Sequence, residues 1–211
     1  MCYHPWDFPD PFHAFMKYRL GEEGFRKIME LVGTQLVKAV GNAQEAIIDS
    51  TPLEASRYNP YALFNPHYQI KMDKAQIFHY GNYPLFMIYS DGTTNDKPYF
   101  YPRIQMVSGM DPEMSAIVLD AGYDHGRKEQ VGKYLRNINC LDEDFGSKCK
   151  NRSHCERKHK HIKDTVKFDI RGLLHTSKEM YTYANFVSYQ ILMLAHSQLK
   201  FENENEFCKY I

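Results

Sequence analysis

The sequence predicts a mixed α/β fold, because segments with the apolar patterns of strands and of helices alternate along the chain. Residues 21–41 and 177–199 carry apolar side chains at helical spacing. Between them, apolar runs at 75–80, 85–90 and 115–119 end in turn-forming residues, as strands do. We therefore expect a mixed sheet flanked by helices, with an N-terminal helical arm and a long C-terminal helix.

The N-terminal helix is expected over 21–41, where the sequence GEEGFRKIMELVGTQLVKAVG ends at a glycine. The apolar positions at helical spacing are Phe25, Ile28, Met29, Leu31, Val32, Leu36 and Val40. The run AIIDS at 46–50 predicts a short strand. The Pro- and Tyr-rich stretch 51–69 is interpreted as loop in large part.

The middle of the chain predicts a β-hairpin. The strands at 75–80 and 85–90 are joined through Gly81 and Asn82, which favour a tight turn. The sequence DGTTND predicts a second turn after the hairpin, and a helix is expected near 97–108.

The C-terminal helix is expected over 177–199. The Met and aromatic side chains between 180 and 194 recur at helical spacing, which is the pattern of core packing. We divide the chain into a helical arm at 1–44, one α/β domain at 45–200 and a tail at 201–211 that is expected to fray.

Composition favours a single globular domain, because 211 residues with 43% hydrophobic content can bury one sizeable core. The formal net charge is zero, so the chain is not expected to coat nucleic acid over its whole surface. Over 126–167, however, Lys and Arg outnumber Asp and Glu two to one. Such a segment is either a solvated face or a surface that binds phosphates.

Cysteine usage indicates a reducing cytoplasm. The five cysteines form an odd set without a CxxC pair, and the N-terminus lacks a basic start followed by an apolar run. Every apolar run falls short of the roughly 18 residues that a membrane span needs, so no membrane partner is expected.

Two aspartates stand out because each follows an apolar, strand-like run. Asp49 follows AII and Asp120 follows AIVL. A charged side chain at the end of a buried strand is costly unless it is paired or bound to a metal ion. Either residue alone is more simply a turn-forming strand end. Two of them in nearly the same local context favour a shared site.

The segment NRSHCERKHKHIK at 151–163 combines a carboxylate with basic residues. On a helix, the side chains that share one narrow face are Arg152, Glu156, His159 and Lys163. Such a face is commonly a surface ion-pair ladder, which contributes little. It can also present a metal-binding carboxylate between cations that hold a phosphate. The pattern assigns no role to His159.

These residues and their surroundings resemble the DDE transposases of bacterial insertion sequences, whose catalytic domain has the RNase H-like fold. The resemblance covers about 45–195 and includes AIIDSTPLEASRYNPYALFNPHYQIKMDKAQI, AIVLDAGYD and NRSHCERKHKHIKDTVKFDIRG. Asp49 matches the first aspartate of the family, and Asp120 matches the second.

The glutamate helix of the family carries a Y-(2)-R-(3)-E-(6)-K signature. Arg152, Glu156 and Lys163 match its last three members at the required spacing. Cys149 stands in place of the tyrosine.

The resemblance implies a DNA transposase that uses two divalent cations, Mg²⁺ or Mn²⁺. The implied catalytic residues and metal ligands are Asp49, Asp120 and Glu156, since hard cations prefer carboxylate oxygens. The implied reaction is hydrolytic nicking of the transposon end, after which the freed 3′ hydroxyl attacks a phosphodiester of the target.

Double-stranded DNA is the implied partner, both as transposon ends and as target. Arg152 and Lys163 would hold the backbone near the scissile phosphate. Arg157 and Lys160 belong to the same basic, DNA-facing surface. A homodimer on the DNA stays open, and the implied location is the cytoplasm, in association with the nucleoid.

Two further interpretations stay open, an inactive member of the same family and a nuclease. Residues 124–151 contain no apolar strand where an RNase H-like sheet normally has its fifth, so the chain looks internally shortened. It could then be a catalytically inactive transposase remnant that only binds DNA. A structure-selective nuclease would use the same carboxylates without strand transfer.

A different class of function is a zinc or nucleic-acid-binding module. Its ligands would be Cys149, Cys155, His159 and His161, but their C-x5-C-x3-H-x-H spacing is not a standard structural zinc pattern. On a continuous helix the two histidines point about 200° apart, which disfavours one shared metal ion.

Overall fold

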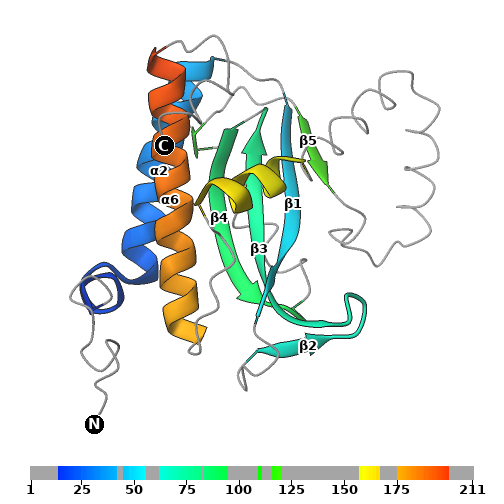
Figure 1. The fold of residues 1–211 in the computed structure, drawn as a ribbon. Coiled ribbons are helices and arrows are strands. Elements are labelled where there is room, and N and C mark those ends of the chain that lie inside the picture. The colour runs from blue at the N-terminus through cyan, green and yellow to red at the C-terminus, as the bar shows by residue number, and fades with distance from the viewer. Residues whose placement is uncertain are drawn as a thin grey trace, which may run out of the picture.

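The structure of the chain is a computed structural model that describes residues 14–41, 45–55, 62–81, 83–94, 109–110, 116–119, 157–166 and 175–199. Its elements are η1 (Phe15–Leu20), α2 (Gly21–Val40), β1 (Glu45–Glu54), β2 (Leu63–Asn65), β3 (Ile70–Tyr80), β4 (Tyr83–Asp91), β5 (Ala116–Leu119) and α6 (His175–Leu199), with a further helical segment at 157–166. The predicted mixed α/β architecture is confirmed: helices lie beside a small, mainly antiparallel sheet (Figure 1). The predicted helix near 97–108 and the tail at 201–211 lie outside the described residues.

The sheet is organised around β3 and β1. β3 pairs antiparallel with β4 and with β1, and β1 pairs in parallel with β5. The short β2 pairs antiparallel with the start of β3. Met72 of β3 pairs with both Glu54 of β1 and Leu63 of β2, so β2 lies on the side of β3 opposite to β1. β1 therefore lies between β3, with which it pairs antiparallel, and β5, with which it pairs in parallel.

The predicted hairpin is confirmed in β3 and β4. Gly81 in its turn has a φ of 54°, a left-handed conformation that glycine adopts without steric cost. The pairing shifts register between Phe78 and His79, just before the turn. Thr94 donates its backbone N–H to the Asp91 carbonyl at 3.0 Å, which confirms the described part of the second turn.

β1 is longer than the sequence predicts. It runs on to Glu54 instead of ending near residue 50, and β2 also lies within the stretch 51–69 that was interpreted mainly as loop. Pro52 is the reason for the wrong boundary, because proline has no backbone N–H to give to a sheet. It is tolerated here because β1 pairs with β5 only up to Ile48, and beyond that point β3 is its partner among the described strands.

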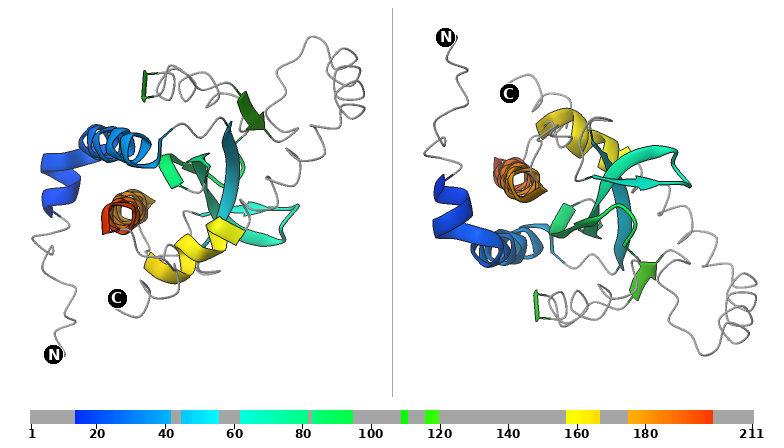
Figure 2. Two further views of the ribbon diagram at one scale, coloured as in Figure 1. Left: turned by 90° about the horizontal axis from the view of Figure 1, so that it is seen from above. Right: turned by 90° about the horizontal axis from the view of Figure 1, so that it is seen from below.

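Two long helices cover the β4 side of the sheet. α2 buries Phe25, Met29 and Leu36, as its periodicity predicts, although Leu31 is 67% exposed. The predicted stripe of α6 is buried as well, and the rings of Phe25 and Tyr183 stack at 5.9 Å. Figure 2 shows α6 lying between α2 and the helical segment 157–166. Among the described helices, none is both long and apolar enough to cross a membrane.

Side chains of α6 cover the outer edge of β4. Among the described strands β4 pairs only with β3, which leaves backbone groups along its other edge. The Tyr89 N–H donates to the Tyr183 hydroxyl at 3.3 Å. The amide of Gln190 donates to the carbonyls of Pro84 and Leu85 at 3.2 and 2.7 Å. The helix therefore satisfies polar groups that a neighbouring strand would otherwise take.

A buried ion pair joins the first turns of α6 to three strands. Lys178 Nζ lies 2.9 Å from Asp73 Oδ2 of β3, with the two side chains 1% and 4% exposed. The Tyr89 hydroxyl of β4 donates to the same oxygen at 2.7 Å. Lys178 also donates to the β1 carbonyls of Leu53 and Glu54, at 3.2 and 3.4 Å. Both charges are thus hydrogen-bonded as well as paired.

The ion pair leads to a stability prediction. In Lys178→Met the apolar stem is kept, but Asp73 is left as an uncompensated buried charge, which costs roughly 3–5 kcal/mol. Urea unfolding of the variant measures this loss in the free energy of unfolding. The double variant Lys178→Met, Asp73→Leu should recover most of it, because neither charge then remains.

The control for Lys178 is Lys27→Met, which removes an exposed partner of Glu23. Exposed pairs contribute at most about 1 kcal/mol, so this change should have little effect. A loss for Lys178→Met that is no larger than the loss for Lys27→Met would contradict the buried pair.

A second stability prediction concerns the contact of α2 with β4. A Cβ atom added at Gly33 would lie 2.9 Å from the Leu85 carbonyl oxygen, a backbone atom that cannot easily move away. Gly33→Ala should add an overpacking cost of about 1–3 kcal/mol. The roughly 1 kcal/mol that alanine gains over glycine in a helix offsets part of this cost, so the net loss should be up to about 2 kcal/mol. Thermal unfolding against Gly109→Ala, where the added atom meets open space, tests the prediction.

Candidate functional site

Of the seven predicted site residues, four are described. Asp49 lies in β1, and Arg157, Lys160 and Lys163 lie in the helical segment 157–166. The remaining three, Asp120, Arg152 and Glu156, lie outside the described residues, as does Cys149.

Asp49 is buried in the middle of β1, pairing with Ile77 of β3. The prediction that this aspartate ends its strand is wrong, because β1 continues to Glu54. Asp49 Oδ1 accepts the backbone N–H of Ser50 at 2.9 Å. Asp49 Oδ2 lies 3.9 Å from Nδ1 of His159 in the helical segment. The carboxylate thus faces the segment that the sequence analysis singled out.

The described parallel pairing of β1 with β5 ends with Ile48 opposite Leu119. In the sequence each of these two residues is followed directly by a predicted aspartate.

The helical segment 157–166 is fastened to the sheet through one of its faces. Ile162 is fully buried. Lys158 Nζ donates to the Gly81 carbonyl at 2.7 Å, and Lys163 Nζ donates to the Pro52 carbonyl. These contacts hold the buried His159 against β1 and β3.

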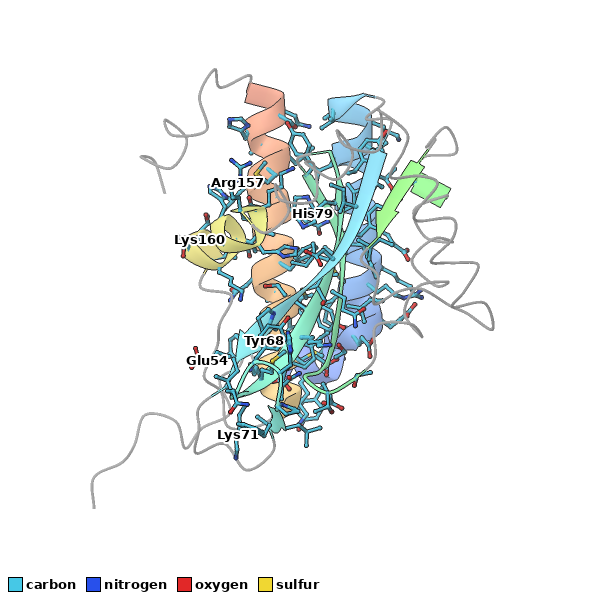
Figure 3. All side chains as sticks on the ribbon, turned by 90° about the vertical axis from the view of Figure 1, so that its right-hand side faces the viewer. Glu54, Tyr68, Lys71, His79, Arg157 and Lys160 are labelled. Carbon is cyan, nitrogen blue, oxygen red and sulfur yellow. The ribbon has the colours of Figure 1, made fainter. Side chains whose placement is uncertain are left out.

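The opposite face of the segment is exposed and carries Arg157 and Lys160 together with Asp164. Arg157 and Lys160 are exposed, and Figure 3 shows both on the outer side of the segment, away from His79. Lys163 is half-buried, since its ammonium group contacts the β1 backbone. Of the predicted DNA-binding residues that the structure describes, Arg157 and Lys160 are therefore the most accessible to a phosphate backbone.

Two buried histidines stand next to each other behind Asp49. The rings of His79 and His159 lie 5.0 Å apart and are tilted by 40°. Within the described part of the chain, both nitrogens of His79 and Nε2 of His159 are buried without a hydrogen-bond partner. Buried polar atoms normally have a partner, and an exception points to a water, an ion or a functional role.

Burial shifts the protonation of both histidines. Burial, together with His159 and Lys158, holds the pKa of His79 well below the ordinary value of 6.5. Burial, together with Lys163 and Lys158, lowers the pKa of His159 from 6.5 to about 4. Both imidazoles are therefore neutral at pH 7, since the charged form would be desolvated next to lysines.

The other histidine of the segment faces a different element. His161 Nδ1 lies 2.8 Å from the hydroxyl of Tyr189 in α6, whereas His159 faces β1 and β3. The two side chains are thus directed to different neighbours, as the helical angle between them predicts. Across the ranges that the structure describes, no group of three or more His, Cys, Asp and Glu side chains is arranged to hold a metal ion.

Sequence reasoning missed the two buried histidines as parts of the site. The sequence signal for His159 was its position three residues after Glu156, a spacing that predicts a shared face if the segment is helical. The only local signal for His79 is an ionisable residue within an apolar strand, AQIFHY. Its contact with His159 depends on tertiary packing and has no signature in the sequence.

Comparisons of this chain with protein-family models, with curated proteins and with solved structures give no match.

The buried histidines predict a loss of stability in acid. As the pH falls below about 6.5, the unfolded chain takes up protons that the folded protein does not bind. The free energy of unfolding should therefore decrease from pH 6.5 toward the folded pKa of His159, about 4. In His79→Leu this decrease should be shallower, while stability at pH 7.5 is equal or higher, because buried unsatisfied nitrogens are removed.

Urea unfolding at a series of pH values tests this expectation. The matched control is His67→Leu, because His67 is exposed in a turn and should leave the shape of the profile unchanged. Identical profiles for wild type and His79→Leu would show that His79 is not held neutral by burial.

Proposed function

We propose that the chain is a DDE transposase with an RNase H-like catalytic domain, which cuts and joins DNA by means of two divalent cations. The ligands would be Asp49, Asp120 and Glu156. The observation that carries the proposal is the environment of Asp49. It is a carboxylate buried in the centre of the sheet, and it faces a helical segment whose first residue, Arg157, directly follows Glu156.

The pairing of β1 and β5 supports a common site for the two aspartates. β1 continues past Asp49 to Glu54, but its described parallel pairing with β5 runs only to Ile48, the residue before Asp49. β5 is in register with β1 up to the residue before each aspartate. Two carboxylates from neighbouring strands and a third from the helix that packs across β1 would surround one small space.

Among the described residues, Asp49 and His159 would supply two of the ligands of a divalent cation at this position. Hard cations such as Mg²⁺ or Mn²⁺ prefer carboxylate oxygens. The ring nitrogen of His159 that faces Asp49 is Nδ1, which lies 3.9 Å from Oδ2. When bound, a pair of such cations would activate water and stabilise the leaving oxygen of a phosphodiester.

The chain's own residues would orient the reactants around these cations. The β1 backbone and the Ser50 N–H hold Asp49 in one orientation. Arg157 and Lys160 present charge on the outer face of the same segment, where a DNA backbone could bind by its phosphates alone. Lys163 binds the Pro52 carbonyl and so helps fix the segment, in addition to the phosphate contact that we propose for it.

The reaction would proceed in two displacements at phosphorus. In the first, a water oxygen attacks and the bond to the 3′ oxygen breaks, which leaves a 3′ hydroxyl and a 5′ phosphate. In the second, that hydroxyl attacks a phosphodiester of the target and displaces its 3′ oxygen. Neither step needs a covalent intermediate with the protein.

The test is cleavage of labelled duplexes that cover the two genomic flanks of the coding sequence, with Mn²⁺ or Mg²⁺. We expect metal-dependent nicking and strand joining by the wild type, and activity at background level in Asp49→Asn, because the amide removes the charge that holds the cation. Asp164→Asn is the matched control, since Asp164 is an exposed carboxylate of the same segment.

Each outcome of the cleavage experiment has a separate meaning. Equal nicking by wild type and Asp49→Asn would refute the proposed site. Nicking without strand joining would favour a nuclease. Absence of nicking by a folded, DNA-binding wild type would favour a catalytically inactive remnant.

A further inference from the structure

The distance between Asp49 and His159 is unusual for two buried polar groups. Asp49 Oδ2 and His159 Nδ1 are 3.9 Å apart. A direct N–H···O hydrogen bond has a separation of about 2.7–3.2 Å, so these atoms face each other without bonding. The pair is held there from both sides, by the β1 backbone and by the anchored helical segment.

This separation suits two ligands of one cation. Carboxylate oxygens and imidazole nitrogens bind first-row divalent metals at about 2.0–2.2 Å. Two ligands of one ion are therefore about 3 Å apart when they lie at right angles and about 4.3 Å apart when they lie opposite each other. The 3.9 Å between Asp49 Oδ2 and His159 Nδ1 falls inside that interval.

The sequence adds a further donor at the right spacing. In the sequence, Glu156 precedes His159 by three residues. A Glu-x-x-His pair of this kind supplies metal ligands in helical bundles that bind two metals through carboxylates. The sequence thus contains a histidine three residues after the signature glutamate, and the family signature does not require that histidine.

The buried ring nitrogens of His79 and His159 Nε2 suit groups that hydrogen-bond to a metal ligand without binding the metal themselves. A histidine that binds a metal through one nitrogen nearly always gives its other N–H to a carboxylate, a carbonyl or a water. His159 Nε2 and both His79 nitrogens are buried without a partner among the described residues, and the two rings are adjacent. One buried water between the rings would join His159 Nε2 to one of the two His79 nitrogens.

We propose that His159 supplies an imidazole nitrogen ligand to the divalent cation held by Asp49, with His79 as its outer partner. This inference rests on the proposed function, in which Asp49 binds metal. It makes the site a mixed nitrogen and oxygen site. Mg²⁺ demands oxygen ligands and gives up its waters reluctantly, whereas a first-row transition-metal cation accepts an imidazole nitrogen at less cost. The protein should therefore prefer Mn²⁺ to Mg²⁺.

The test is electron spin-echo envelope modulation of Mn²⁺ bound to the full chain without DNA. A coordinated imidazole gives a nitrogen coupling, which changes when the histidines are labelled with ¹⁵N. We expect this coupling in the wild type and its loss in His159→Gln. The variant should also bind Mn²⁺ roughly 10- to 100-fold more weakly, with a smaller effect on Mg²⁺.

Two controls make the assignment specific. His161→Gln removes the other described histidine of the same segment, which faces Tyr189, and it should keep the full nitrogen coupling. His159→Asn serves as a second variant if the glutamine substitution does not fold, as judged by circular dichroism. Nitrogen coupling that persists in a folded His159 variant would overturn the inference, because another residue would then be the ligand.

The outcomes separate this inference from the proposed function. If Mn²⁺ binds and Asp49→Asn removes it, but the wild type shows no imidazole coupling, His159 is not a ligand and the transposase proposal stands. If the wild type binds no Mn²⁺ at all, both proposals fail.

Discussion

The buried pair of Lys178 and Asp73 fixes how the long C-terminal helix meets the sheet. A buried ion pair adds little net stability over a hydrophobic alternative, but its directional bonds admit few arrangements. Here one ammonium group binds Asp73 on β3 and two carbonyls on β1, while Tyr89 of β4 binds the same carboxylate. With the start of α6 fixed on three strands, Tyr183 and Gln190 farther along reach the backbone of β4.

The candidate site depends on a second set of polar contacts with the backbone. Lysines 158 and 163 bind carbonyls at the end of β3 and in β1, and Ile162 is buried beneath them. These contacts lie on both sides of His159 in the sequence, so they determine where its ring meets Asp49. A site held in this way by a strand and an anchored helix is more exact in geometry than one built on loops.

The local parts of the fold could be predicted from sequence, and the long-range parts could not. Periodicity gave α2 and α6, and turn residues gave the hairpin, because these signals act over a few residues. The length of β1 was underestimated because Pro52 is tolerated only through the pairing of its neighbours. Asp49 was found as a candidate, but its contact with His159 joins segments more than a hundred residues apart, and no local pattern records it.

The cover that α6 provides for β4 has a consequence for synthesis on the ribosome. The strands β1 to β5 all precede residue 120, whereas the side chains that occupy the open edge of β4 belong to 183–190. Among the described strands, a sheet that formed before α6 was translated would lack these contacts along the β4 edge. Exposed strand edges can pair with other extended chains, so docking of α6 would remove one route to aggregation.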